Sequence, residues 1–574
     1  MSIQFEPMKT TLSHIRPWLV AVVLAGLPAL GFSAPWQSIT QPIGTLLIDP
    51  PESALRVNQY LMSLDPNITP ATYPFDLNTD VTKIRTTQVL YFVRVYDEAT
   101  GSRPVGSWIM RASQARGLTA TQIRNIQALP ALPTHFTLVK VPTGITLYTG
   151  VAGAIAGWGD GGATQSKLMG PPFVPRENFT NQQLIGDCFL CYRSLATEGN
   201  AHRVGAALDK AVPPAYSSLD VLYDNLDMLY FGPTADQFRQ ALNALSGEAV
   251  TASQQVALGN AASFTDAIRE QTALWVSGWS PTKSSEPSAS ERPGRVWASL
   301  KGGTSMLRGD HGAAGVNASG AGVQLGLDHA MSPGMLVGVA LGVNNSSYSV
   351  NDRASNGTLN GLNAAIYGVA RSDNAYLSAT LAYAWSDTGL SRDIQVNQLQ
   401  SPQNGRFDSQ VLSARLEAGY LAKLGSLNVT PFIAIEPGWL WQSGFSEKNR
   451  DPAMYPVNLG LDVRSQQINS LPGSIGVQLD AQYPLDNGWA VRPVVRLAWI
   501  HEFSPTREAS ASFSLLPSQT FTIYGASAPQ NTARMMLGIT GTHRDGLTSY
   551  LMLDANLSNR SQAYGARAGM SLRF

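Results

Sequence analysis

Residues 295–574 alternate between apolar and polar side chains, and this two-residue period restricts the fold more than any other feature of the chain. In the last segment, apolar side chains from Tyr564 to Phe574 share one face, whereas Gly565, Arg567 and Ser571 share the other. A period of two places alternate side chains on opposite faces of a β-strand. The segments 412–420, 491–503 and 551–557 repeat the pattern. The region is therefore predicted to be a series of strands with one apolar face each.

Two features favour a membrane barrel over a soluble sandwich. The alternating segments run for about ten residues or more, which is longer than soluble strands usually are. Aromatic side chains recur near segment ends, where the interfacial girdles of membrane barrels lie; they are Tyr348, Trp385, Trp439, Trp441, Trp499 and Tyr564. About twelve segments alternate in this way, and outer-membrane barrels have an even number of strands. The predicted fold is all-β: a transmembrane 12-stranded antiparallel barrel.

Three motifs in this region resemble a known family. They are Arg295-Val-Trp-Ala298, Gly322-Val-Gln-Leu-Gly-Leu-Asp328 and Leu572-Arg-Phe574, and they look like the translocator domain of classical (type V) autotransporters. The resemblance implies a barrel in the lipid of a Gram-negative outer membrane, with a passenger at the cell surface or released. It also implies that the outer-membrane assembly machinery reads the C-terminal strand that ends in Phe574.

The N-terminus predicts a targeting segment. Lys9 and Arg16 precede the apolar run Trp18–Leu30, and the small residues Ser33 and Ala34 follow. This order is typical of a secretory signal peptide over residues 1–34, although an N-terminal membrane anchor is the alternative. The run is shorter than the roughly 20 apolar residues of a spanning helix. Forty basic residues balance forty acidic ones, so no global field attracts nucleic acid.

Residues 201–280 predict a helical pre-barrel segment. Val204, Ala207, Leu208 and Ala211 recur at helical spacing, and residues 281–294 read as a polar junction. The resemblance to autotransporters implies that this segment ends in a helix threading the pore, whereas an ordinary helical bundle is the alternative. Such a helix would find polar partners on the inner wall; the candidates are Arg415, Glu417, Glu436, Arg492 and Arg496.

Residues 35–200 remain for a compact α+β passenger domain. Thr119 is predicted to cap a short helix through Arg124, and residues 136–141 and 145–148 are predicted strands. Cys188 and Cys191 are the only cysteines of the chain, and in an exported protein they predict a structural disulfide. Because neither a second Cys-x-x-Cys nor a nearby histidine pair occurs, no metal site is predicted.

One stretch of the passenger carries a candidate active site. Gly161-Gly-Ala-Thr-Gln165, preceded by His135, resembles the tuberculosis-necrotizing-toxin family of NAD glycohydrolases, although Ala163 replaces the third glycine of that family. The resemblance implies NAD as a substrate rather than a bound cofactor. It assigns catalysis to Gln165 and His135, with Arg111 pairing a phosphate, and substrate binding to Trp158, Gly161 and Gly162.

A second class of function stays open for the passenger. A non-enzymatic adhesin or surface-binding module would present an aromatic contact patch, for which Trp108, Tyr148 and Trp158 are candidates. Its ligand would belong to a host or a neighbouring cell.

Overall fold

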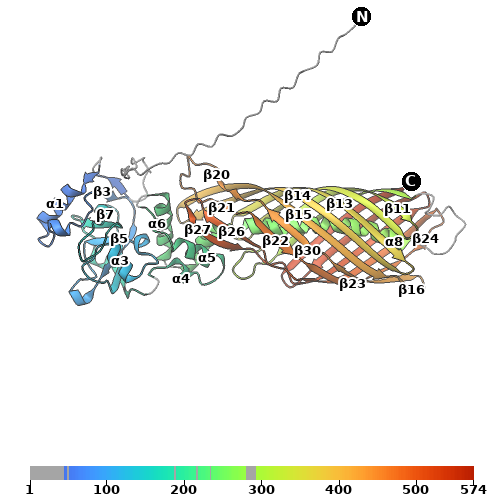
Figure 1. Cartoon of the computed structure of the whole chain (residues 1–574), viewed down its shortest axis with the longest axis horizontal. Helices are drawn as coiled ribbons and strands as arrows, with labels where there is room; N and C mark the ends of the chain where they lie inside the picture. Colours follow the sequence, from blue (N-terminus) through green and yellow to red (C-terminus); the bar gives the residue numbers. More distant parts are fainter. Residues whose placement is uncertain (1–43, 48–50, 187–188, 215–216, 233, 279–292) are drawn as a thin grey trace, which may run out of the picture. The chain divides into compact units, whose positions relative to one another are not determined.

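The computed structural model describes residues 44–47, 51–186, 189–214, 217–232, 234–278 and 293–574 (Figure 1). The predicted signal peptide lies outside the described residues, as does almost all of the predicted junction over 281–294. Among the described helices, none is both long and apolar enough to cross a membrane.

The passenger is built on one nine-stranded sheet with the strand order β1-β3-β7-β8-β5-β4-β6-β9, in which β2 pairs with β3. Its strands are β1 (Gly44–Leu46), β2 (Glu52–Ser53), β3 (Asp80–Thr86), β4 (Leu90–Tyr96), β5 (Trp108–Arg111), β6 (His135–Val141), β7 (Thr146–Val151), β8 (Thr164–Met169) and β9 (Phe179–Leu184). The helices α1 (Ala54–Leu64), α2 (Ala112–Ala115) and α3 (Ala120–Ile126) accompany the sheet. The strands predicted over 136–141 and 145–148 are confirmed as β6 and β7.

The predicted cap of α3 is confirmed. Thr119 Oγ1 accepts a hydrogen bond from the backbone N–H of Gln122 at 3.3 Å. The Gln122 side chain accepts from the backbone N–H of Thr119 at 2.9 Å. This reciprocal pair satisfies two of the N–H groups that a helix start leaves without partners.

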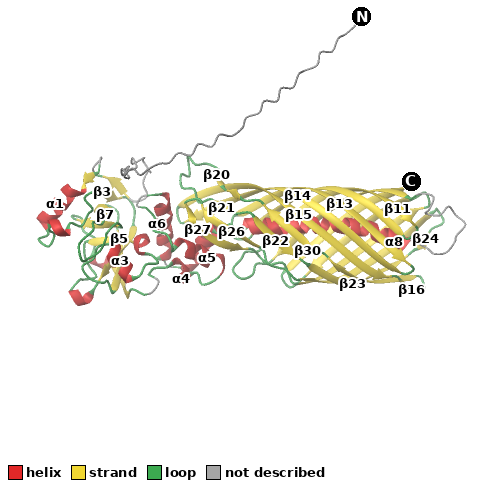
Figure 2. Cartoon of the chain, in the orientation of Figure 1, coloured by secondary structure: helices red, strands yellow, loops and turns green. Residues whose placement is uncertain are grey.

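Four short helices follow the passenger and form what we call the helical cap: α4 (Tyr192–Leu195), α5 (Gly199–Leu208), α6 (Ser218–Tyr230) and α7 (Ala235–Leu245). The first of these helices begins at Tyr192, about ten residues before the predicted start of the segment at residue 201. A fifth helix, α8 (Ala249–Gly278), is 30 residues long and runs inside the barrel (Figure 2).

The C-terminal region forms a closed barrel of twelve antiparallel strands, as predicted. In chain order the pieces are β10 (Gly294–Leu307), β11 (Val316–Ser332), β12 (Met335–Val350), β13 (Ser355–Ser372), β14 (Ala375–Val396), β15 (Leu399–Tyr420), β16 (Ala422–Leu424), β17 (Leu427–Ile435), β18 (Gly438–Gln442), β20 (Lys448–Asn449), β22 (Gln466–Ser470), β23 (Pro472–Ala481), β24 (Tyr483–Pro484), β25 (Trp489–Glu502), β28 (Asn531–His543), β29 (Leu547–Leu557) and β30 (Ser561–Arg573). Several interrupted strands account for the larger number of pieces. Pairing of β10 with β30 closes the wall, so the barrel itself leaves no sheet edge.

The outer wall is apolar, as the alternation predicts. Leu551, Met570 and Leu572 are 48%, 56% and 45% exposed, which is the opposite of a soluble core. Arg415, Glu417 and Arg496 lie on the inner wall and are buried, as predicted. The prediction for Tyr348 is wrong. It is 3% exposed and points inward, where its hydroxyl donates to Ala249 O at 2.8 Å.

The two ends of the barrel differ in their connections. Short turns at 333–334, 373–374 and 425–426 lie at one end, and the longer connections 308–315, 443–465 and 503–530 lie at the other. Outer-membrane barrels have short periplasmic turns and long extracellular loops. The long connections hold a four-stranded sheet, the extracellular sheet, made of β19 (Phe445–Ser446), β21 (Leu461–Val463), β26 (Glu508–Phe513) and β27 (Leu516–Tyr524).

Candidate functional site: the helix inside the barrel

Helix α8 runs through the barrel lumen, and its contacts at the two ends show the direction in which the chain runs. At its N-terminal end, Ala249 contacts Tyr348 of β12 and Glu248 Oε2 accepts from the N–H of Ala314 in the loop 308–315 at 2.6 Å. At its C-terminal end, the carbonyl of Val276 accepts from Arg371, next to the short turn at 373–374. The chain therefore enters the lumen at the end with long loops and leaves at the end with short turns.

The sequence of α8 suits a polar enclosure rather than an ordinary helix packing site. Small and polar residues occur on all sides of the helix, and its few large apolar side chains, such as Phe264 and Ile268, do not form a pronounced apolar stripe. Yet most of its side chains are buried, including Gln254, Arg269 and Gln271. Buried polar groups need partners, because an unpaired neutral group costs about 1–3 kcal/mol and an unpaired charge costs more. The barrel wall supplies those partners.

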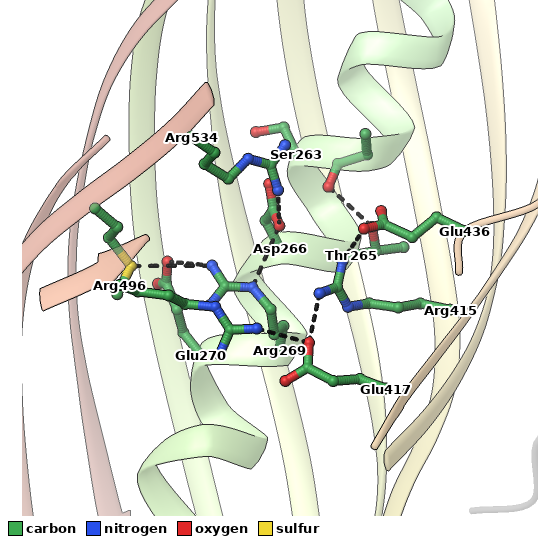
Figure 3. Close-up of polar contacts among 12 residues, drawn as sticks. Ser263, Thr265, Asp266, Arg269, Glu270, Arg415, Glu417, Glu436, Arg496 and Arg534 are labelled. Atoms are coloured by element: carbon green, nitrogen blue, oxygen red, sulfur yellow. Dashed lines mark hydrogen bonds and ion pairs between the residues drawn. The ribbon is translucent and has the colours of Figure 1, made fainter. Parts of the chain in front are cut away.

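Ion pairs join the middle of α8 to the wall (Figure 3). Asp266 Oδ1 lies 3.1 Å from Arg534 Nη1 of β28. Glu270 pairs with Arg567 of β30. Arg269 Nε lies 3.3 Å from Asp266 Oδ1 on the same helix. Gln271 donates to the Tyr550 hydroxyl at 2.9 Å. The helix is thus held by charge pairs on the side where the barrel closes.

A second charge cluster lies further round the wall, from β25 to β15. Glu417 accepts from Arg415 at 2.5 Å and from Arg496 at 2.8 Å, and it also accepts from the Tyr376 hydroxyl at 2.8 Å. Arg415 pairs in addition with Glu436 (Figure 3). Of the five predicted inward residues, Arg492 bonds α8 directly, through Ser277. The charged residues on the wall were predictable from the sequence. Asp266 and Glu270, the acids of α8 that pair with Arg534 and Arg567, were not singled out.

The helix does not fill the lumen completely. A cavity of about 320 Å³ remains between α8 and the wall beside the β10–β30 seam. Gly259 and Ser263 line it from the helix, and Lys301 lines it from the wall. The arrangement is a plug with residual space for water rather than an open pore.

The helical cap packs on the extracellular end through one apolar core. Tyr192, Leu222, Phe238 and Leu242 of the cap are fully buried against residues of the strand ends and the extracellular sheet; these include Leu390, Phe407, Leu459, Phe513 and Ile523. Asn200 of α5 also pairs with the backbone of Tyr524 in β27, accepting from its N–H at 2.8 Å and donating to its carbonyl at 2.7 Å.

Buried arginines join the passenger to the cap. Arg111 Nη1 lies 2.7 Å from Asp220 Oδ2 and the same guanidinium contacts Asp224, both on α6. Arg116 is 1% exposed, pairs with Asp227 and stacks over the ring of Tyr192 at 3.7 Å. Burial raises the pKa of the Tyr192 hydroxyl well above its usual value. The two arginines therefore act as structural links.

The predicted catalytic residues do not meet. Arg111 pairs with two carboxylates, and its pairing with a phosphate stays a prediction. His135 begins β6, where its Nδ1 lies 2.8 Å from Thr134 Oγ1 and its ring stacks on Tyr96. Gln165 lies on β8 and donates to Pro74 O at 2.5 Å. Strands β8 and β6 are separated by β5 and β4, a distance of about 14 Å across the sheet.

The glycine-rich stretch is a closed turn. The N–H groups of Trp158 and Gly159 donate to Ile155 O, Gly161 donates to Asn125 O at 3.0 Å, and Gly162 donates to Ala152 O at 2.8 Å. Gly161 and Gly162 have φ of +69° and +95°, which favour glycine. Because these amides bond within the turn, they are not free to hold a phosphate. A role of Gly161 and Gly162 in substrate binding stays a prediction.

The three aromatic side chains predicted for a binding module do not form one exposed patch. Tyr148 is 5% exposed beneath Tyr60, and Trp108 packs on Phe75. Trp158 is half-buried in the 155–159 turn. Cys191 is disulfide-bonded, whereas Cys188 lies outside the described residues.

Comparison with known proteins agrees with this architecture. Residues 296–554 match the autotransporter beta-domain family. Two curated proteins called extracellular serine protease, both from Serratia marcescens, are 23% and 21% identical to this chain over 279 residues. The match covers 49% of this chain but spans only 26% of the length of those relatives.

Solved structures with a similar fold include two bacterial translocator units. The translocator domain of the autotransporter NalP from Neisseria meningitidis is 14% identical, with a TM-score of 0.40, over 55% of this chain and 98% of that one. The beta domain of the Bordetella autotransporter BrkA is 17% identical, with a TM-score of 0.37, over 49% and 100%. The family model covers residues 296–554, so this region of the chain is similar to an autotransporter beta-domain.

Proposed function

We propose that this protein exports its own N-terminal domain and retains it on the cell surface. The observation that carries the proposal is the apolar core shared by the helical cap and the extracellular end of the barrel. A released passenger would need a connection that separates easily. Here the cap buries Tyr192, Leu222 and Phe238 completely, and each such side chain stabilises the contact by roughly 1.5–3 kcal/mol.

A second contact strengthens this retention. Arg392 of β14 donates to the carbonyl of Ala244 at 2.8 Å and pairs with Glu447 at 2.6 Å. The arginine is 1% exposed, and it connects the end of α7 to the barrel wall. Because the pair is buried, removing one partner and leaving the other charge unpaired would cost about 3–5 kcal/mol of stability. Separation of cap and barrel would expose the pair.

A cut between two cap helices tests retention directly. A specific protease site inserted after Gly232 separates α6 from α7 in the chain while leaving the packed helices in place. We expect the cleaved passenger to stay on washed cells and to be released by moderate urea. Release on washing in buffer alone would contradict retention, and the uncut protein under the same urea serves as the control.

The passenger is proposed to bind a partner rather than to hydrolyse NAD. Helix α1 supports this, because apolar side chains that flank its buried face remain partly exposed. Leu55, Tyr60 and Leu64 are 46%, 46% and 58% exposed, although Val57 and Leu61 of the same helix are buried. Contiguous exposed apolar side chains mark interaction surfaces, and Tyr60 and Leu64 lie one turn apart on α1.

Two measurements separate these classes. Cells displaying the protein are expected to release no nicotinamide from NAD, whereas release that is lost in Gln165→Ala would support the glycohydrolase. The double variant Tyr60→Ser, Leu64→Ser is expected to reduce adhesion to host or neighbouring cells. Gln59→Ser on the exposed side of the same helix is the matched control.

We further propose that the assembly machinery of the outer membrane recognises strand β30. The backbone N–H of Phe574 donates to Gly294 O at 2.9 Å, and the Phe574 ring is 60% exposed on the lipid side. A side chain at Gly294 would collide with that ring. Phe574→Ser is expected to lower the amount of folded barrel, read as heat-modifiable migration on a gel. An unchanged amount would argue against recognition through this residue.

A further inference from the structure

A polar groove lies on the outer wall of the barrel, near the extracellular end. It encloses about 620 Å³ and is lined by side chains from β13, β14, β15 and β20. Most of the side chains that line it carry amide, hydroxyl or basic groups. They include Asn356, Thr358, Ser391, Asn404, Arg406 and Lys448. This composition contrasts with the apolar wall nearer the periplasmic end.

The groove follows from the register of the strands. Thr358, Gly389 and Arg406 lie opposite one another across β13, β14 and β15. Gly389 leaves the centre of this row without a side chain. A Cβ added there would meet only Thr358 Oγ1, at 3.7 Å, so a larger residue would fill the hollow without displacing the wall.

The groove faces the layer in which lipid headgroups lie. On β14 the outward residues change from Leu381, Tyr383 and Trp385 to Asp387 and Gly389. Aromatic girdles mark the edge of the hydrocarbon region. Gly389 is four residues beyond Trp385, about 13 Å along the strand and about 10 Å along the membrane normal for an ordinary strand tilt. A ligand here would be attached to the outer leaflet.

The charges favour an anionic group in the groove. Arg406 is held by a bidentate pair with Asp387 at 2.8 Å, and Arg450 pairs with Asp393. Lys448, by contrast, forms no ion pair with any acid among the described residues. Its ammonium is therefore available for a phosphate, and the neighbouring amides and hydroxyls match the donors and acceptors of sugar hydroxyl groups.

We propose that this groove binds the phosphorylated saccharide headgroup of an outer-leaflet glycolipid. The phosphate contacts Lys448 and the outer edge of Arg406, and the sugar hydroxyls contact Asn356, Ser391 and Asn404. Such binding would fix the barrel laterally to its lipid neighbours just below the cap.

Native mass spectrometry of the full-length protein in detergent, titrated with lipopolysaccharide, tests the proposal. Gly389→Phe fills the hollow and Lys448→Glu reverses the free charge. Lys448→Glu is expected to bind about tenfold more weakly, the order that follows from losing one charge-assisted hydrogen bond. Gly389→Phe is expected to weaken binding at least as much, because its ring occupies the space of the headgroup. Gly302→Phe, at an exposed glycine of β10 outside the groove, and Lys423→Glu, near a periplasmic turn, are the matched controls and are expected to bind as the parent does.

Three outcomes would overturn the proposal. The first is that the groove variants bind lipopolysaccharide as tightly as the parent does. The second is that phosphatidylglycerol binds as tightly as lipopolysaccharide and is weakened equally by the variants. The third is that inorganic phosphate displaces the glycolipid at comparable concentrations. The second outcome would indicate a general anionic-lipid contact and the third a free-phosphate site. Heat-modifiable migration verifies that each variant is folded, and Lys448→Glu decides the matter if Gly389→Phe fails to assemble.

Discussion

Helix α8 and the helical cap are consecutive in the chain and both pack apolar side chains on the barrel, but only α8 is also anchored by a row of charge pairs to the wall among the described residues. In the lumen, α8 is bound by ion pairs and hydrogen bonds, such as Glu270 with Arg567. Outside, α4–α7 share an apolar core with the barrel end, in which Leu222 and Phe238 are 0% exposed. The difference follows from the surroundings: a barrel lumen is polar, whereas a domain on an outer surface gains stability by excluding water.

The comparison also teaches where specificity comes from. Buried ion pairs contribute little net stability, because desolvation offsets their attraction, but breaking one partner is costly. An apolar core contributes stability in proportion to the area it buries. The lumen contacts therefore set the position of α8, and the cap contacts set how firmly the passenger is held.

Loss of the cap core has the largest expected effect. Phe238→Ala removes a ring that packs against Tyr192 and Tyr230 at centroid distances of 5.3 and 5.4 Å, and it should cost about 3–5 kcal/mol. We expect the cap to become sensitive to trypsin on intact cells while the barrel keeps its heat-modifiable migration. Gln240→Ala, exposed on the same helix, should leave both unchanged. Equal trypsin sensitivity of the two variants would refute a cap core that folds as a unit.

Replacing an arginine that pairs with α8 should destabilise the helix more when that arginine is more deeply buried. The Arg567 side chain is 5% exposed and that of Arg534 is 22% exposed, although both pair with acids of α8. Arg567→Gln leaves Glu270 buried beside a neutral group, at a cost of about 3–5 kcal/mol. Arg534→Gln leaves Asp266 near water and near Arg269, at a cost of about 1 kcal/mol.

Single-channel conductance in planar bilayers measures this difference. We expect frequent openings to a larger conductance in Arg567→Gln, because a weakly held helix uncovers the lumen. Arg534→Gln should behave nearly as the parent does. Openings of equal frequency in the two variants would show that these ion pairs do not hold the plug.

The barrel was predictable from sequence because lipid applies one rule to every outward residue. Leu551, Met570 and Leu572 obey it, so the alternation alone gives strand faces and the fold. Tyr348 shows the limit of the rule. Its position near a strand end suggested the aromatic girdle, but the inward phase of its strand places it against Ala249 of the plug. Residue type predicts a girdle only when the phase of the strand is also considered.

The passenger site was not predictable, because its outcome depends on tertiary partners far away in the chain. Arg111 looked available for a phosphate, yet Asp220 and Asp224 from the cap occupy it across a separation of about a hundred residues. The amides of the glycine-rich turn looked free, but Asn125 and Ala152 accept their hydrogen bonds. Neither contact leaves a periodic signal in the sequence.

High pH should loosen the cap and leave the lumen contacts in place. Burial raises the pKa of both Tyr192 and Tyr223 above the usual value near 10. The folded cap keeps these protons when the unfolded chain loses them. The stabilisation is thus complete below about pH 10 and declines above it, by about 1.4 kcal/mol per pH unit for each tyrosine.

Ultraviolet tyrosinate absorbance, followed together with trypsin sensitivity, tests this dependence. The two tyrosines should ionise only as the cap opens, so the two signals should rise together above pH 10. Tyr223→Phe should shift the transition upward, because one of the two coupled ionisations is removed. Ionisation of these tyrosines in a trypsin-resistant cap would disprove the linkage.

The smallest expected effect concerns a contact that the sequence alone predicts. Thr119→Ala removes the side-chain acceptor of the α3 cap and should destabilise the passenger by about 1 kcal/mol, read as a lower urea midpoint for the passenger. Thr121→Ala, exposed on the same helix, should be neutral or slightly stabilising, because alanine is the better helix former. Neither change should alter cap proteolysis or barrel migration. A shift in either would mean that the passenger unfolds together with the cap, through Arg111 and Arg116, rather than as a unit of its own.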